Sequence, residues 1–249
     1  MSLRFGMWTL GGTIVTSLLV LIGPAAAQTM SLDMGDGASA TGRIVQIIAL
    51  ITVLSLAPSI LVMVTSFTRI IVVLSFLRNA LGVQQTPPNA VLISLALFLT
   101  AFVMAPTLEQ SYKDGIAPLL ASEINEEEAF SRSVKPFHSF MMNHVREQDL
   151  KLFLEMSKAP PTETAENTPL RSLVPAFMIS ELRRAFEIGF LIFVPFLVID
   201  MVVASVLMSM GMMMLPPIMI SLPFKLIFFV LVDGWYLVAG SLIRSYGGS

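Results

Sequence analysis

The feature that constrains this fold most is an apolar, methionine-rich stretch at Met201–Phe224 (MVVASVLMSMGMMMLPPIMISLPF). Gly211 stands before three consecutive methionines there, and a proline pair follows them. Because a proline pair lacks two backbone donors and restricts the residue before each ring, the sequence predicts a turn near Met212–Pro217. Long apolar runs flank it, Ile188–Leu215 and Ile218–Ile243, and they predict two helices that fold back at this turn.

The predicted turn carries a functional hypothesis of its own. Non-helical backbone at membrane depth is tolerated where it lies inside protein or lines a cavity, so we expect the turn to face other subunits or a pore. Methionine suits a hole that must close and reopen, because its side chain is flexible and polarizable. The alternative is that these methionines only fill space between other apolar side chains.

The composition is typical of an integral membrane protein. The chain has 249 residues, of which 55% are hydrophobic and 13% charged, and its mean hydropathy is +0.80, whereas soluble domains are about one quarter charged. A formal net charge of −2 provides no basic field to attract nucleic acid. The sequence has no cysteine, which excludes disulfides and thiolate catalysis. Two histidines cannot build a zinc site without carboxylates, so we expect no metal and no cofactor.

Residues 1–27 have the pattern of a cleavable secretory signal. Arg4 provides the positive start, Thr13–Ile22 is a short apolar core, and Ala25–Ala27 offers small residues for cleavage. The alternative is an uncleaved first membrane helix, for which this apolar core is short. Residues 28–43 are polar and rich in turn-forming residues, which predicts a flexible arm on the exported, periplasmic side.

Residues 44–108 predict the first two hydrophobic helices. The run Ile44–Phe67 is uncharged and long enough to cross a bilayer at about 1.5 Å per residue, and Pro58 should kink it. Arg69 and Arg78 follow. The rule that short inner loops are rich in lysine and arginine therefore places this connection on the inner side.

The second hydrophobic helix follows a loop with its own proline pair, Gln84–Asn89 (QQTPPN). Asn89 is a candidate cap, because a side-chain oxygen at that position can accept a hydrogen bond from the first free backbone N–H groups. The apolar run is Ala90–Ala105. We expect Pro106 to end the helix, because proline lacks the backbone donor.

Residues 109–187 form the one water-compatible region and predict a helical periplasmic segment. Glu126–Glu128 are interpreted as a solvated helix face and not as a metal site. Apolar residues recur at helical spacing, which predicts one amphipathic helix over Phe137–Lys158. His138 and His144 are six residues apart and therefore face different sides, which argues against a shared metal.

A further helix is predicted from Pro169 and carries a charged sequence, SELRRAFEIGF. Within it Glu181 is expected to pair with Arg184 at i+3, and Arg183 with Glu187 at i+4. Because apolar chain follows at once, we expect these four charges to lie near a membrane surface or a subunit contact.

Residues 188–249 predict a second hydrophobic hairpin that three charges interrupt. Asp200 and Lys225 are equally far from the middle of the predicted turn, so the fold-back should bring them to similar depth. We expect them to pair, within the hairpin or between subunits, because an unpaired charge at membrane depth costs several kcal/mol. Asp233 has no obvious partner, and we expect one across a subunit boundary. The three charges serve assembly or gating under this interpretation.

Three blocks of the sequence resemble the FliP family of bacterial flagellar export-gate proteins. They are PAFMISELRRAFEIGF (Pro175–Phe190), VASVLMSMGMMMLPP (Val203–Pro217) and LPFKLIFFVLVDGW (Leu222–Trp235). The resemblance covers nearly all of the expected mature chain, and the signal suits flagellar members.

This resemblance implies a non-enzymatic core subunit of the flagellar type III protein export gate. Such a protein is expected in the bacterial inner membrane, as a multi-pass component of the flagellar basal body. The family forms a homo-oligomer, expected to be a pentamer, with FliQ and FliR. It also implies contacts with other export apparatus proteins, with membrane lipid and with unfolded flagellar substrates that cross the pore. The family's gate is expected to sit largely above the plane of the membrane despite its hydropathy.

The resemblance also implies roles for individual residues. The methionine cluster of the family forms a gasket around the pore, which on this chain corresponds to Met208, Met210, Met212, Met213 and Met214. Independently of the resemblance, the charges that stand directly before an apolar run predict that the helix carrying Glu181, Arg183, Arg184 and Glu187 makes subunit contacts.

Two other functions are considered. The equivalent subunit of a virulence type III secretion system would share the core pattern. An ion or proton channel or transporter would use Asp200, Lys225 and Asp233 as a relay. An enzyme is not expected, since the sequence has no glycine-rich phosphate loop, HExxH motif or credible nucleophile–base set. The expected fold class is all-α, with membrane-associated bent helical hairpins and a helical periplasmic segment.

Overall fold

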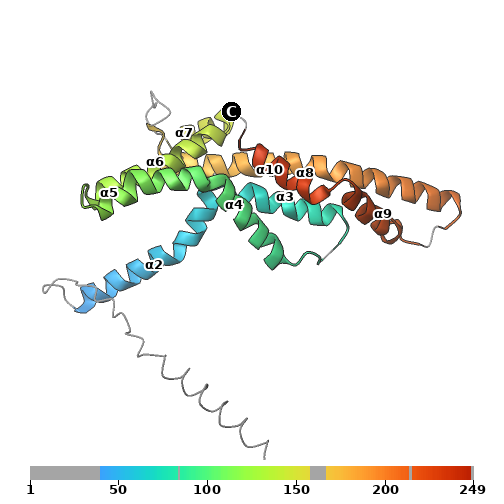
Figure 1. Cartoon of the computed structure of the whole chain (residues 1–249), viewed down its shortest axis with the longest axis horizontal. Coiled ribbons are helices and arrows are strands. Elements are labelled where there is room, and N and C mark those ends of the chain that lie inside the picture. The colour runs from blue at the N-terminus through green and yellow to red at the C-terminus, as the bar shows by residue number, and fades with distance from the viewer. Residues whose placement is uncertain (1–39, 84, 158–166, 213–214, 248–249) are drawn as a thin grey trace, which may run out of the picture. The chain divides into compact units, whose positions relative to one another are not determined.

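The computed structural model describes four stretches of the chain: residues 40–83, 85–157, 167–212 and 215–247. The expected signal at 1–27 and most of the expected arm at 28–43 lie outside the described residues. All regular elements within the described stretches are helices (Figure 1), which confirms the predicted all-α class.

In chain order, the described helices are α2 (Ala40–Val64), α3 (Phe67–Ala80), α4 (Asn89–Ser111), the π-helical turn η1 (Tyr112–Ile116), α5 (Ala117–Leu120), α6 (Glu126–His144), α7 (Glu147–Met156), α8 (Leu170–Ser209), α9 (Pro217–Leu231) and α10 (Gly234–Arg244). The chain divides into two units, residues 1–54 and residues 55–249. The start of α2 belongs to the first unit, and the turn and the charged clusters described below belong to the second.

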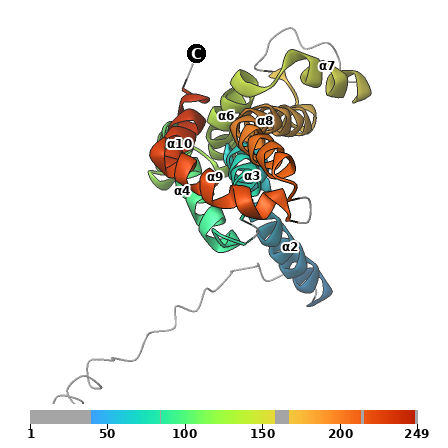
Figure 2. The same ribbon diagram turned by 90° about the vertical axis from the view of Figure 1, so that its right-hand side faces the viewer.

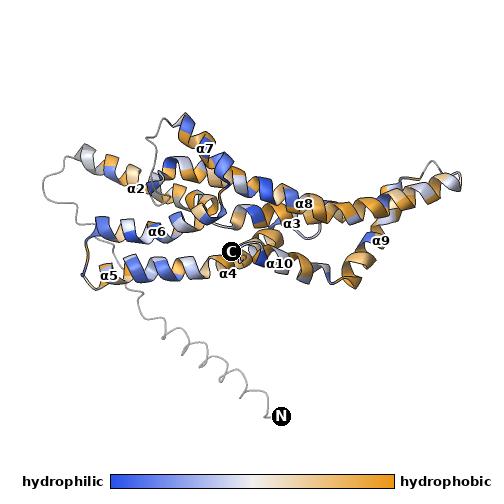
Figure 3. Cartoon of the chain, turned by 90° about the horizontal axis from the view of Figure 1, so that it is seen from above, coloured by the Kyte–Doolittle hydropathy of each residue, from blue (hydrophilic) through white to orange (hydrophobic). Residues whose placement is uncertain are grey.

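Several helical segments are long and apolar enough to cross a membrane. Three qualify singly: Ile44–Val64, Asn89–Leu120 and Leu170–Ser209. α9 and α10 qualify only as a pair, and they are bent by 62° at the break between them. The apolar run Ile218–Ile243 is therefore a bent pair of helices. In Figure 3, apolar residues dominate α8 and α9, whereas polar residues gather on α6 and α7.

α4 does not end at Pro106, contrary to the prediction. The proline removes one backbone donor, yet the helical run continues through η1 and α5 to Leu120. Its far part is fastened to α6, where Ser111 Oγ donates a 2.8 Å hydrogen bond to the carbonyl oxygen of Ser133. Gly115 lies so close to α6 that a Cβ there would come within 2.0 Å of Ser133 Oγ. These tertiary contacts compensate for the lost backbone hydrogen bond.

The segment predicted as one helix at Phe137–Lys158 is two helices, α6 and α7. Val145 is extended between them, and the backbone N–H of Arg146 donates to Ser180 Oγ on α8 at 3.1 Å. Ser180 Oγ in turn donates to Asp149 Oδ2 at 2.7 Å. The helix breaks because this polar junction fixes the start of α7 to α8, which periodicity along one segment cannot reveal.

The start of α4 also differs from the prediction. Asn89 is the first helical residue and not the cap, because Pro88 occupies the cap position. Its Oδ1 instead accepts a 2.5 Å hydrogen bond from Arg78 Nη1 of α3. α8 begins at Leu170, directly after Pro169 and one residue later than predicted, which is within the usual uncertainty of helix ends.

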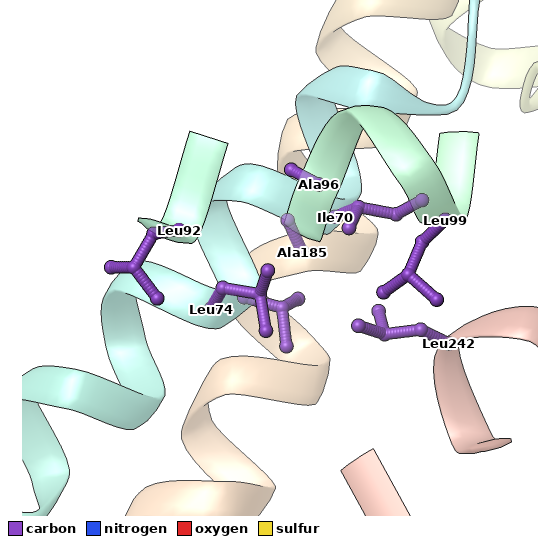
Figure 4. Packing of buried hydrophobic residues seen from close by; sticks show 8 residues of the cluster. Ile70, Leu74, Leu92, Ala96, Leu99, Ala185 and Leu242 are labelled. Atoms are coloured by element: carbon purple, nitrogen blue, oxygen red, sulfur yellow. The ribbon is translucent and has the colours of Figure 1, made fainter. Parts of the chain in front are cut away.

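The centre of the second unit is the pair α3 and α8, which lie side by side (Figures 1 and 2). They approach closely at Gly189 of α8, where a Cβ would lie 2.5 Å from the ring of Phe76 on α3. α4 and α10 complete the main apolar cluster (Figure 4), and each buried leucine or isoleucine in it contributes about 1.5–3 kcal/mol. Its buried members are Ile70, Val73, Leu74, Leu92, Ala96, Leu99, Ala185 and Leu242.

Candidate functional site

The predicted turn is present between α8 and α9, and hydrogen bonds define its first half. The N–H of Met212 donates to the carbonyl of Leu207 at 3.0 Å, and that of Gly211 to Met208 at 3.1 Å. Gly211 has φ +74°, a left-handed conformation that glycine adopts without a Cβ clash. This is the Schellman arrangement that commonly ends helices. Pro216 then precedes the first residue of α9, so the chain reverses over a few residues.

The methionines near this turn contribute little to the core of their own chain. Met208 and Met210 are 58% and 64% exposed, and Met212 is half-buried. Met213 and Met214 lie outside the described residues. The observed exposure argues against the space-filling alternative for Met208 and Met210, at least within one copy of the chain. Their role as a gasket stays a prediction.

An apolar groove of about 540 Å³ runs between α8 and α9. It marks a stretch where the two helices of the hairpin do not fill the space between them. The residues that line it are all apolar: Val198, Ile199, Val202, Val203, Val206, Leu207, Ile220, Phe224 and Phe228.

Asp200 and Lys225 pair within the hairpin, as their equal distance from the turn led us to expect. Lys225 Nζ lies 2.6 Å from Asp200 Oδ2, and Ser221 Oγ donates to Asp200 Oδ1 at 2.5 Å. Lys225 Nζ also donates to the carbonyl oxygen of Ala80, the last residue of α3, at 3.1 Å. A cation is favourable there, because the carbonyl groups at a helix C-terminus carry partial negative charge. The pair therefore ties the hairpin to α3.

The burial of this pair makes it sensitive to change. Lys225 is buried and Asp200 is partly exposed. Removing one partner of a buried ion pair costs about 3–5 kcal/mol, since it leaves the other charge uncompensated. Whether the pair serves assembly or gating stays a prediction.

A second charged cluster joins α3, α8 and the C-terminal end of the described chain. Arg69 and Glu181 are both wholly buried and form a two-point ion pair, in which Arg69 Nε donates to Glu181 Oε2 at 2.9 Å and Arg69 Nη2 to Oε1. The Tyr246 hydroxyl also donates to Glu181 Oε2. The Arg69 guanidinium lies 3.8 Å from the centre of the Tyr246 ring and donates to Ser245 Oγ at 3.0 Å.

This cluster corrects two predictions. Arg69 is not in a loop, since it is wholly buried in α3, and the membrane side on which it lies stays a prediction. Glu181 does not pair with Arg184, because it is engaged by Arg69 and Tyr246. The local i+3 contact is worth only a few tenths of a kcal/mol, whereas a buried carboxylate needs a full set of donors. Burial, together with the nearby Glu181 carboxylate, raises the pKa of Tyr246, so its hydroxyl stays protonated and can donate.

The other predicted charges fall into different settings. Arg183 pairs with Glu187 on the exposed face of α8, with Arg183 Nε 3.0 Å from Glu187 Oε1, as expected. Arg184 is half-buried and its Nε is enclosed without a hydrogen-bond partner among the described residues. Asp233 lies at the break between α9 and α10 with φ +51°, and it forms no ion pair within the described chain.

The polar residues of the segment at 109–187 have structural roles. Glu126–Glu128 form the exposed first turn of α6, as expected for a solvated face, and Asn125 caps it by accepting from the Glu128 N–H at 2.8 Å. His138 Nε2 lies 2.8 Å from the Thr168 carbonyl oxygen, and the His144 ring packs at a tilt against the rings of Phe140 and Tyr246. The two histidines thus serve different contacts.

Three residues of these clusters were not predicted from the sequence: Ser221, Arg69 as a buried partner, and Tyr246. Charges in apolar runs usually need partners, so Arg69 could have been matched with Glu181 on that ground. Ser221 lies one helical turn before Lys225 and faces the same side of α9. No signal in the sequence marks Tyr246.

Known proteins are similar to this chain over most of its length. The model of the FliP family matches residues 50–242. The flagellar biosynthetic protein FliP of Caulobacter vibrioides is 62% identical over 237 residues, 94% of this chain and 89% of the relative. The proteins of that name from Bacillus subtilis and Aquifex aeolicus are 56% and 46% identical, over 81% and 93% of this chain and 91% and 98% of the relatives. The matched region contains the turn and the ion pairs Asp200–Lys225, Arg69–Glu181 and Arg183–Glu187.

Proposed function

The chain belongs to the FliP family, and on this basis we propose that it is a core subunit of the flagellar protein-export gate, with the α8–α9 turn at its narrowest point. The observation that carries the proposal is the Schellman turn at Gly211, which leaves Met208 and Met210 exposed at the end of a hairpin. The relatives are named as flagellar proteins, which favours a flagellar over a virulence secretion system.

The exposed surface of the hairpin supports an assembly of several copies. Phe190 and Leu191 on α8 are each 68% exposed, and Leu231 on α9 is 79% exposed. Large exposed apolar surfaces mark contacts with protein or membrane. We propose a homo-oligomer with FliQ-like and FliR-like subunits in the bacterial inner membrane, in which these surfaces meet neighbouring helices or lipid.

The gate would work through the physical properties of the thioether side chains. Methionines from several copies, converging on one axis, close the opening by packing. A narrow apolar constriction also excludes water and ions by dewetting. An unfolded polypeptide can pass because each methionine changes rotamer at low energetic cost, and the ring closes behind it. The chain's own role in this mechanism is structural and not catalytic.

The paired charges fit a supporting role better than an ion relay. Lys225 is buried and has two acceptors, the Asp200 carboxylate and the Ala80 carbonyl. A relay needs groups that exchange protons or ions with water. We infer that this pair holds the hairpin on α3 so that the turn keeps its position.

The test is the ion tightness of the membrane. Replacing Met212, Met213 and Met214 together by alanine should give cells whose membrane leaks ions, while the assembled complex is still recovered. Met156→Ala is a matched control, because Met156 is also exposed, at 70%, but lies on α7 far along the chain from the turn. Normal ion tightness in the triple variant, with the complex intact, would contradict the gasket.

A further inference from the structure

The charges in the hydrophobic hairpin can be accounted for almost completely. Three ion pairs involve its helices: Arg69–Glu181, Arg183–Glu187 and Asp200–Lys225. Of the remaining charged residues of α8, α9 and α10, Arg171 and Arg244 lie in the first and last turns of their helices. Two other charges have no ion-pair partner among the described residues: Arg184 within α8, and Asp233 at the break between α9 and α10.

Arg184 lies beside a cluster that already has too few anions. Arg184 stands three residues after Glu181 on α8, about one helical turn away, so two guanidinium groups, those of Arg69 and Arg184, lie near one carboxylate. Both Glu181 oxygens are taken by other donors. The Nε of Arg184 is enclosed and lacks an acceptor. Arg184 is only half-buried, so a carboxylate from outside the chain can pair with the part of its guanidinium that is not enclosed.

Asp233 is a carboxylate without a cation partner among the described residues. It occupies the cap position of α10, but its side chain makes no capping hydrogen bond. The corner it occupies is fixed, because Gly234 fits tightly against the Phe229 ring. Its neighbours are exposed and apolar, with Leu231 79% and Tyr236 68% exposed. A carboxylate in such a surface is costly to cover unless the covering surface brings a cation.

We propose that Asp233 of one copy of the chain pairs with Arg184 of the adjacent copy. This inference rests on the proposed function, because it requires an oligomer. Within one copy the two groups form no ion pair, yet each supplies what the other lacks. In a ring with heterologous contacts, each copy would place its Asp233 against one neighbour and accept the Asp233 of the other neighbour at its own Arg184. The pair would thus fix the register between neighbours.

Cross-linking tests this contact directly, because the chain has no cysteine of its own. Two differently tagged copies are co-expressed, one carrying Arg184→Cys and the other Asp233→Cys, and membranes are treated with a short bis-maleimide. A disulfide is avoided, since an arginine–carboxylate contact holds the backbones farther apart than a disulfide allows. We expect a covalent dimer that carries both tags, and none when Arg171→Cys replaces Arg184→Cys.

Charge reversal provides the second arm. Arg184→Glu and Asp233→Arg should each reduce the yield of assembled complex by about tenfold or more, and the double variant should recover most of it. Arg171→Glu, an exposed cation on the same helix, should leave assembly unchanged. No mixed-tag dimer and no recovery in the double variant, from a chain that still forms its oligomer, would overturn the pairing alone. A wild-type chain that forms no oligomer would overturn the proposed function itself.

Discussion

Lys225 and Asp200 meet across the hairpin at 2.6 Å, although they are separated by the whole methionine-rich turn. The same lysine donates to the last carbonyl of α3. One ammonium group therefore links three helices, α8, α9 and α3.

The first prediction concerns the unequal burial of this pair. Asp200→Asn should destabilise the protein by about 3–5 kcal/mol, because it leaves the buried Lys225 without a counter-charge. Lys225→Met should cost less, since Asp200 is partly exposed and keeps the Ser221 hydrogen bond. Thermal unfolding of the purified protein in detergent measures both. Equal losses in the two variants would mean that burial does not set the energy.

A double variant in which the two charges exchange places tests the same pair in another way. Aspartate at position 225 would face the carbonyl of Ala80, which needs a donor. We therefore expect Asp200→Lys with Lys225→Asp to recover only part of the stability lost by either single swap. Recovery of nothing would count against the pairing, and full recovery would count against the contact with α3.

The second prediction concerns the contact of α3 and α8 at Gly189. Gly189→Ala should destabilise the protein by about 1–3 kcal/mol, because the new methyl group would overlap the Phe76 ring. The matched control is Gly240→Ala on α10, where the nearest atoms belong to the flexible end of Arg244. Unfolding temperatures of both variants provide the comparison. A Gly189→Ala protein as stable as the control would show that the helices can separate without cost.

The third prediction separates backbone from side-chain effects at the turn. Gly211 has open space around it but a positive φ, so Gly211→Val should cost about 1–2 kcal/mol through backbone strain alone. Gly211→Asn should cost less, because asparagine adopts this conformation more readily. The two variants are compared by thermal unfolding and by ion leak. If both variants behave alike, the conformation at Gly211 does not control the turn.

The fourth prediction concerns the buried cluster at Arg69. Glu181→Gln should be severely destabilising, because Arg69 is wholly buried and would lose its counter-charge. Tyr246→Phe removes a single donor to Glu181 and keeps the ring under Arg69, so about 1–3 kcal/mol is expected. Unfolding experiments on the two variants test the order. A larger loss for Tyr246→Phe would reverse our assignment of the ion pair as the main contact.

Sequence reasoning predicted those features that depend on local or symmetric patterns. The turn follows from Gly211 and the proline pair, and the Asp200–Lys225 contact follows from their equal distance to it. The Arg183–Glu187 pair follows from i+4 spacing. Each of these relations lies within one helix or one hairpin, so the position along the chain is sufficient to infer position in space.

The predictions that the structure contradicts share a different cause. Glu181 was assigned to Arg184 by the i+3 rule, but its real partner, Arg69, is 112 residues away in sequence. Local patterns predict a helix end at Pro106 and no break at Val145, but contacts between helices outweigh the local preference at both places. Single-sequence patterns contain no information about which distant helix will lie alongside.

The central claim is that the α8–α9 turn lies at the narrowest part of an oligomeric pore, and a resolved structure of the purified multimer tests it most directly. The account predicts that the turns of several copies converge on the axis, with methionine side chains facing one another across it. Turns that point outward into lipid or detergent, far from the axis, would contradict it.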